Sequence, residues 1–154
     1  MNDPSEVERL AEHIARRAHD GQTDKAGHPY IEHPARVAAR LTDPELRAAA
    51  WLHDVVEDTD WTADRLLEAG MPDRVVETVV AVTRLPGQDD DAYYAQVAAS
   101  GEGTAVKQAD IADNADPNRL ALLDPATRAG LEAKYTKALQ AIAAHREGPT
   151  HSPR

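Results

Sequence analysis

Three of the Asp-Pro pairs in this chain mark where helices begin, and they constrain the fold more than any other feature of the sequence. The pairs stand at Asp3-Pro4, Asp43-Pro44 and Asp124-Pro125. An aspartate at the N-cap accepts a hydrogen bond from a free N–H group of the first helical turn, and a proline at the first helical position has no N–H to leave unpaired. Apolar residues recur at spacings of three and four beyond these pairs, so we expect a helix to begin at each proline.

The same apolar spacing predicts further helices between these starts. The valine-rich stretch Val75–Val82 also allows a strand, but the spacing from Pro72 to Arg84 favours a helix. The sequence shows no strand pattern, internal repeat or low-complexity linker. We therefore predict an all-α fold, a single helical bundle of about eight helices. The expected helices span residues 4–19, 33–41, 44–58, 62–70, 72–84, 91–99, 104–113 and 125–146, and Ser100–Gly103 is expected to be a loop.

Composition excludes several classes of site. The 154 residues fit one domain, expected over residues 1–146, with residues 147–154 as a flexible tail. The chain contains no cysteine, which excludes disulfides, zinc–thiolate sites and a cysteine nucleophile. A net charge of −10 argues against nucleic-acid and membrane partners and makes binding of an anionic substrate depend on a local cation. Because no signal-peptide pattern or long apolar run is present, we expect a soluble cytoplasmic protein.

The octet Trp51–Asp58 combines a histidine with three acids in a segment expected to be helical. At helical spacing His53 lies under Glu57 and Asp54 lies under Asp58. The like-charged pair costs about 0.2–0.5 kcal/mol, and acids near a helix C-terminus oppose the macrodipole by about 0.3–1 kcal/mol each. Local costs of this kind are typical of functional sites, here one for a divalent cation and phosphate chemistry. A solvated acidic face with an incidental His-Asp pair is the alternative.

Two other segments supply candidate ligands. His33 comes shortly after the expected loop Gly21–Pro29 and begins a helix, although a lone histidine at such a junction is more often structural. Asp110 and Asn114 lie one turn apart, a spacing that also suits a solvated helix face. Two histidines and two aspartates together form a mixed nitrogen and oxygen set suited to Mn²⁺ or Fe²⁺. The sequence supports no role for the remaining histidines, which are His13, His19, His28, His145 and His151.

Four motifs, taken in order, resemble those of a known family. They are Ala18-His19-Asp20-Gly21-Gln22, Pro29-Tyr30-Ile31-Glu32-His33-Pro34, Leu52-His53-Asp54-Val55-Val56-Glu57-Asp58-Thr59 and Lys107-Gln108-Ala109-Asp110. The pattern resembles the HD-domain hydrolase of the RelA/SpoT alarmone enzymes, and specifically the small single-domain alarmone hydrolases. The resemblance covers roughly Ala18 to Arg119 and continues weakly to Tyr135.

The resemblance implies roles for individual residues. It implies that one Mn²⁺, for which Fe²⁺, Co²⁺ or Mg²⁺ could substitute, is bound by His33, His53, Asp54 and Asp110. It implies that Glu57 and Asp58 position and deprotonate the attacking water, which is chemistry that carboxylates beside a metal perform. It also implies that Lys25, Asn114 and Tyr135 contact a small-molecule nucleotide.

The chain departs from the family pattern where that pattern contacts substrate. Thr23-Asp24 stands where many relatives have an arginine before the lysine. After Asp110, many relatives read Arg-Leu-His-Asn-Met-Arg-Thr, whereas this chain reads Ile-Ala-Asp-Asn-Ala-Asp-Pro over residues 111–117. The implied function is removal of the 3′-diphosphate from guanosine tetra- or pentaphosphate. Two alternatives stay open: a phosphatase for another nucleotide, such as NADPH or a nucleoside monophosphate, and a nucleotide-binding module without turnover. The sequence predicts no oligomeric state.

Overall fold

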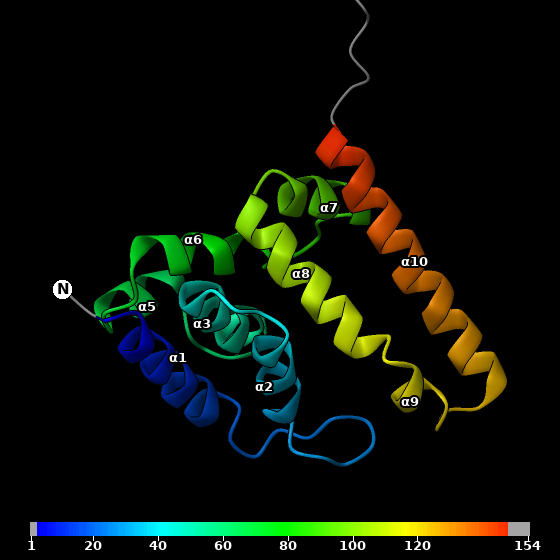
Figure 1. Ribbon diagram of the computed structural model, residues 1–154, viewed down its shortest axis with the longest axis horizontal. Helices are drawn as coiled ribbons and strands as arrows, with labels where there is room; N and C mark the ends of the chain where they lie inside the picture. The colour runs from blue at the N-terminus through cyan, green and yellow to red at the C-terminus, as the bar shows by residue number, and fades with distance from the viewer. Residues whose placement is uncertain (1–2, 148–154) are drawn as a thin grey trace, which may run out of the picture.

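The computed structural model describes residues 3–147, which form ten helices and no β-strand (Figure 1). Eight helices are at least six residues long and two are single turns, so the predicted all-α fold of about eight helices is confirmed. None of the helices in this range is both long and apolar enough to cross a membrane. The predicted tail lies outside the described residues except for Glu147, which ends the last helix. The helices are α1 (Pro4–Ala18), α2 (Glu32–Ala39), α3 (Pro44–Leu52), α4 (Val55–Asp58), α5 (Ala63–Glu68), α6 (Asp73–Ala81), α7 (Asp90–Ala98), α8 (Gly101–Asn114), α9 (Pro117–Leu120) and α10 (Pro125–Glu147).

The Asp-Pro pairs begin helices as expected. Helices α1, α3 and α10 each start at the proline of such a pair. The side chain of Asp43 accepts a hydrogen bond from the backbone N–H of Glu45 at 2.9 Å. A fourth pair, Asp116-Pro117, begins the single-turn helix α9, which was not predicted from the sequence. The missed helix has the same start signal, but it is too short to show an apolar repeat.

Two hydrophobic cores lie on either side of α8. The larger core packs side chains of α1, α2, α3 and α6 against Val106 and Ala109 of α8. The smaller core packs α7 and α10 against Ile111 of α8. Figure 1 shows α8 running through the middle of the molecule, with α1–α6 on one side and α10 on the other. Polar residues of α8 therefore lie where two separately packed groups of helices meet.

The prediction of one continuous helix over residues 44–58 is wrong, because the helix breaks at His53 and Asp54. The backbone N–H of His53 donates to the carbonyl of Ala50 at 3.3 Å, and Nδ1 of the same residue lies 2.6 Å from that oxygen. In a continuous α-helix this carbonyl would accept from Asp54. Asp54 and Asp58 still lie one helical turn apart, because the backbone N–H of Asp58 donates to the carbonyl of Asp54 at 2.9 Å. Glu57 and Asp58 belong to the single turn of α4.

The segment Ser100–Gly103, predicted as a loop, forms the start of α8. The Ser100 hydroxyl caps the helix by accepting from the N–H of Gly103 at 2.8 Å. A Cβ atom at Gly103 would lie only 2.9 Å from Cβ of Ala81 in α6. This glycine therefore serves the close approach of two helices rather than a loop. The valine-rich stretch that allowed a strand is helical from Val75 to Ala81, in α6, and Val82 is the C-cap of that helix.

Candidate functional site

Four side chains predicted as metal ligands converge from three parts of the chain. His33 comes from the first turn of α2, His53 and Asp54 from the break after α3, and Asp110 from α8. One ligand atom from each of His33, His53 and Asp54 lies within 4.8 Å of the others. Oδ1 of Asp110 lies 2.8 Å from Nε2 of His33 and 3.5 Å from Nε2 of His53. The helix break that the sequence did not predict is what places His53 in this cluster.

Hydrogen bonds at the other ring nitrogen orient both imidazoles. A carbonyl oxygen can only accept, so the 2.6 Å contact between Nδ1 of His53 and the carbonyl of Ala50 requires the proton on Nδ1. Nε2 of His53 is buried without a hydrogen-bond partner, although Oδ2 of Asp54 lies 3.0 Å away. Nδ1 of His33 likewise contacts a carboxylate oxygen of Asp113 at 2.7 Å. Both rings therefore direct Nε2, the nitrogen that can ligate a metal, at the cluster.

The donor set fits a divalent cation that accepts nitrogen and oxygen ligands. Ligands at about 2.1 Å in an octahedral shell lie about 3.0 Å from their neighbours, which matches the separations of 2.8, 3.0 and 3.5 Å. Burial raises the pKa of Asp54, but the charge of His53 beside it and a hydrogen bond from Tyr30 bring it to about 2. Burial lowers the pKa of His53, yet Asp54 and Asp110 raise it well above its usual value. The cluster thus favours a positive charge, whether a proton or a metal ion.

Two polar residues around the cluster were missed by the sequence analysis. The Tyr30 hydroxyl donates to Oδ2 of Asp54. Asp113 is 1% exposed and contacts His33 and two arginines, although no role was predicted for it from the sequence. Its position one turn after Asp110 was the only sequence signal for it. Side chains on α8 reach His33 only because α2 packs against α8.

The two predicted catalytic carboxylates differ in their surroundings. Oε1 of Glu57 accepts from the backbone N–H of Arg84 at 2.7 Å, so this side chain is held in place. Asp58 lies beside the cluster, and burial together with the charges of Asp54 and Glu57 raises its pKa to about 6. An acid with this pKa exchanges protons near neutral pH, as a general base does.

A cleft with two adjoining lobes contains the cluster. The metal lobe has a volume of about 240 Å³, and the basic lobe, which holds the lysines and tyrosines, about 190 Å³. Glu57, Asp110 and Asn114 line both lobes. The metal lobe is also lined by Asp24, Tyr30, His33, Asp54, Asp58 and Arg119. The basic lobe is also lined by Arg84, Tyr93, Tyr94, Lys107, Ile111, Lys134, Tyr135 and Ala138.

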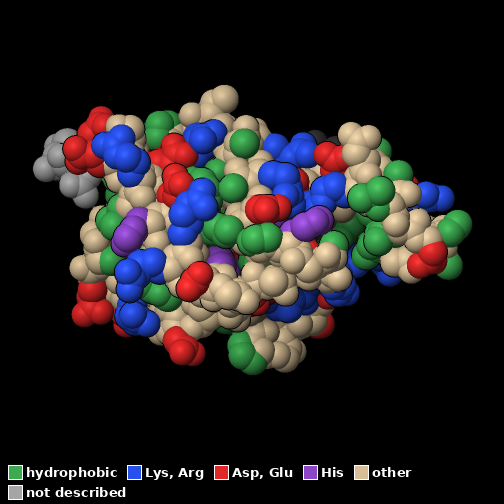
Figure 2. Space-filling model, turned by 90° about the horizontal axis from the view of Figure 1, so that it is seen from below, with side chains coloured by type: hydrophobic (Ala, Val, Ile, Leu, Met, Phe, Trp, Pro, Cys, Tyr) green, Lys and Arg blue, Asp and Glu red, His purple; other side chains and the backbone are tan. Residues whose placement is uncertain are grey.

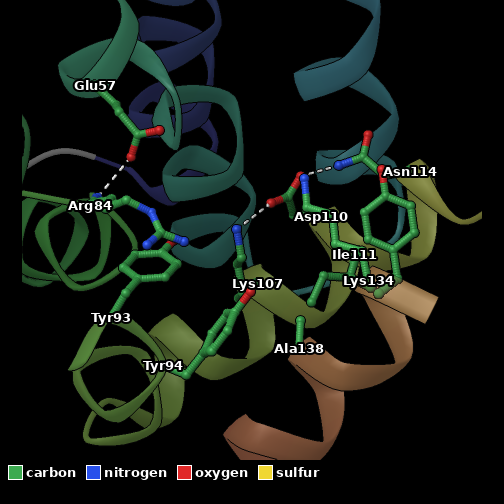
Figure 3. A pocket seen from close by; sticks show the side chains of 11 residues that line it. Glu57, Arg84, Tyr93, Tyr94, Lys107, Asp110, Ile111, Asn114, Lys134 and Ala138 are labelled. Atoms are coloured by element: carbon green, nitrogen blue, oxygen red, sulfur yellow. Dashed lines mark hydrogen bonds and ion pairs between the residues drawn. The ribbon is translucent and has the colours of Figure 1, made fainter. Parts of the chain in front are cut away.

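Figure 3 shows the basic lobe, in which Lys107 and Asn114 point toward Asp110 from opposite sides. Nζ of Lys107 donates to Oδ2 of Asp110 at 3.0 Å, and the Asn114 amide donates to Oδ1 at 3.2 Å. Burial lowers the pKa of Lys107, but Asp110 raises it above the usual value, so this lysine stays charged. Lys107 belongs to one of the four motifs, but no role was predicted for it from the sequence.

The three predicted substrate residues lie in different places. Asn114 and Tyr135 line the cleft. Lys25 is exposed and lines neither lobe, whereas its neighbour Asp24 lines the metal lobe. On the face seen in Figure 2, basic and acidic side chains are interspersed. The net charge of −10 is therefore not gathered into one acidic surface on that face.

Comparisons with known proteins give a consistent result. A family model described as "HD domain" matches residues 11–111. A guanosine-3′,5′-bis(diphosphate) 3′-pyrophosphohydrolase of Vibrio cholerae is 46% identical over 76 residues, which cover 47% of this chain and 11% of the relative. The enzyme of the same name from Aquifex aeolicus is 32% identical over 152 residues, which cover 93% of this chain and 22% of the relative. The chain thus spans about a fifth or less of the length of these relatives.

A solved structure shares the fold over nearly the whole chain. It is described as "A metazoan ortholog of SpoT hydrolyzes ppGpp and plays a role in starvation responses". The similarity has a TM-score of 0.72 at 25% sequence identity and covers 96% of this chain and 89% of the other.

Proposed function

The chain belongs to the HD-domain family, and from this premise we propose that it is a Mn²⁺-dependent hydrolase that removes the 3′-diphosphate of guanosine tetra- or pentaphosphate, releasing pyrophosphate. Membership of the family implies a divalent metal, and His33, His53 and Asp54 form a group that could hold one. Relatives that bear the name of this activity support the choice of substrate. The observation that carries the proposal is one cleft that joins the donor cluster to three basic side chains, Arg84, Lys107 and Lys134.

Four residues would hold the metal: His33, His53, Asp54 and Asp110. A divalent ion bound there supplies Lewis-acid chemistry, because it lowers the pKa of water and offsets the charge of a phosphoryl group. Mn²⁺ suits a set of two imidazoles and two carboxylates, and the absence of cysteine disfavours metals that require thiolates.

The carboxylates of α4 move the protons of the reaction. Hydrolysis adds water across the bond between the 3′-oxygen and its diphosphate, so water loses a proton and the departing 3′-oxygen gains one. Asp58 accepts the water proton in this proposal and returns it to the departing 3′-oxygen, since its pKa of about 6 leaves it mostly ionised at neutral pH while keeping it basic. Glu57, held by the N–H of Arg84, orients the water.

The basic lobe binds the rest of the nucleotide in this proposal. Lys107 and Lys134 offer ammonium groups to phosphate, and Arg84 offers a planar guanidinium that can pair with two phosphate oxygens. Tyr135 stays the predicted neighbour of the nucleoside, and Asn114 the predicted contact to sugar or phosphate. Lys25 also stays a prediction, since it contacts nucleotide only if the substrate extends out of the metal lobe. A cytoplasmic location is part of the same proposal.

One observation favours a second candidate, a phosphatase for a nucleotide with fewer phosphates. Asp24 lines the metal lobe, and a hydrogen bond from the backbone N–H of His28 lowers its pKa, so it stays charged where phosphate would bind. A nucleotide-binding module without turnover is less well supported. Such a module requires the cation to bind phosphate, but it does not require a general base such as Asp58 beside the cation.

A nucleotide panel with Mn²⁺ tests the proposal. Guanosine 3′,5′-bis(diphosphate), NADPH and a nucleoside monophosphate are each incubated with the full chain, and pyrophosphate and phosphate are measured separately. We expect pyrophosphate release from the first compound at the highest kcat/KM, and none from the Asp54→Asn control. Faster release of phosphate from NADPH or the monophosphate would favour the second candidate. Tight nucleotide binding without any product would favour the binding module.

A further inference from the structure

The buried carboxylate of Asp113 joins a metal ligand to an arginine of the cleft. Oδ2 of Asp113 lies 2.7 Å from Nδ1 of His33 and accepts from Nη1 of Arg119 at 2.8 Å. Oδ1 accepts from Nε of Arg36 at 2.8 Å. The Asp113 side chain is 1% exposed, whereas those of Arg36 and Arg119 are 38% and 39% exposed. A carboxylate this deeply buried is tolerated only because three donors surround it.

The contact with His33 fixes how that ring can act. A carboxylate at Nδ1 requires a proton there, so Nε2, which lies 2.8 Å from Oδ1 of Asp110, is the ring nitrogen that would ligate a cation once the cation displaces its proton. The same contact fixes the rotation of the ring and raises the electron density on Nε2, which strengthens its bond to a cation. His53 achieves the same protonation with the carbonyl of Ala50, a neutral acceptor. Of these two ring nitrogens, only that of His33 is held by a charged partner.

The contact between Asp113 and Arg119 holds an arginine that lines the metal lobe. Nη1 of Arg119 donates both to Oδ2 of Asp113 and, at 3.2 Å, to its backbone carbonyl. The arginine therefore cannot swing freely, and its side chain lines the metal lobe. A guanidinium held at this edge is placed to bind a phosphate group in the lobe.

We propose that Asp113 is a positioning residue that orients His33 toward the metal and holds the Arg119 guanidinium against the phosphate of the substrate. Metal binding and phosphate binding then share one buried carboxylate. The inference rests on the proposed function for the identity of the substrate, but its metal-binding part can be measured without any substrate.

The first part of the test measures the dissociation constant of Mn²⁺ by titration of the metal-free full chain. The variants are Asp113→Asn, which keeps the size of the side chain but removes its charge, and Arg36→Gln as the matched control. Arg36 contacts the other oxygen of Asp113 and lines neither lobe. We expect Asp113→Asn to weaken Mn²⁺ binding by about 10- to 100-fold, and Arg36→Gln by less than about 3-fold. Unchanged affinity in a folded Asp113→Asn variant overturns the proposal.

The second part measures hydrolysis of guanosine 3′,5′-bis(diphosphate) by Arg119→Gln at saturating Mn²⁺. We expect KM to rise by about 10-fold or more while kcat and Mn²⁺ affinity stay within about 3-fold, a split that a merely structural role would not produce. An unchanged KM overturns the proposal. If Asp113→Asn does not fold, the Arg119→Gln result alone decides it.

Measurements on the wild-type protein separate the proposed function from the proposed role of Asp113. If it binds Mn²⁺ but hydrolyses no nucleotide, the proposed function fails while the titration still decides the role of Asp113. If it binds no Mn²⁺, both fail.

Discussion

Replacing Asp58 by asparagine should stabilise the metal-free protein at alkaline pH and remove most of its turnover. The pKa of Asp58 is about 6 instead of 3.8, because burial and the charges of Asp54 and Glu57 disfavour the carboxylate. The folded state therefore holds this proton more tightly than the unfolded state, and ionisation lowers stability as pH rises from about 4 to about 6. Two pKa units correspond to about 3 kcal/mol for a fully buried group. Asp58 is only partly shielded, since the residue as a whole is exposed, and solvent screening reduces the gain to about 1 kcal/mol or less.

Urea unfolding in EDTA measures this gain. We expect Asp58→Asn to raise the free energy of unfolding by about 0.5–1 kcal/mol at pH 8 and by almost nothing at pH 4, where the wild-type group is protonated. Asp60→Asn is the matched control, since Asp60 is exposed and lines neither lobe of the cleft. Added Mn²⁺ should shrink the gain, because a cation near Asp54 offsets the repulsion between carboxylates.

The same variant separates catalysis from stability. We expect its Mn²⁺ content to match that of the wild type, while kcat falls by about 10²- to 10⁴-fold, the usual loss on removal of a general base. Wild-type turnover in Asp58→Asn would refute the catalytic assignment. An equal stability gain at pH 4 and pH 8, or the same gain from Asp60→Asn, would refute the electrostatic reasoning.

Three further predictions concern the ligands, the basic lobe and the helix packing. His53→Asn should abolish stoichiometric Mn²⁺ binding measured by elemental analysis, and undiminished metal would place the site elsewhere. Lys107→Met should raise KM by about 10-fold, because it removes an ammonium group offered to phosphate. It should not weaken Mn²⁺ binding, because that ammonium competes with the metal for Asp110. Steady-state kinetics check the KM, and metal titration checks the affinity for Mn²⁺. Gly103→Ala should lower the free energy of unfolding by about 1 kcal/mol, since the 2.9 Å clash with Ala81 outweighs the gain in helix propensity; urea unfolding that shows a stabilised variant would contradict this.

The sequence alone was enough for the all-α class and for the starts of α1, α3 and α10. Pairs such as Asp43-Pro44 act locally, since the cap and the fixed φ of proline depend only on neighbouring residues. The apolar spacing within Val75–Val82 likewise outweighed the β-propensity of valine, and that stretch is helical. The sequence also supplied every residue type of the cluster, because the chemistry of a ligand belongs to its side chain. What it could not supply was the distance between those side chains.

The tertiary structure decided how the site is assembled. His33 meets Asp110 and Asp113 across 77 and 80 residues of chain, because α2 packs against α8. The helix break at His53 involves a hydrogen bond from its side chain to the carbonyl of Ala50. The helical spacing of the octet does not predict this break. The basic lobe forms where α7, α8 and α10 meet, so Lys107 acquired a place beside the site only through packing. Capping and helix propensity are local, so they determine where helices begin. Contacts between distant segments depend on how both hydrophobic cores pack against α8, and no local sequence pattern specifies that packing.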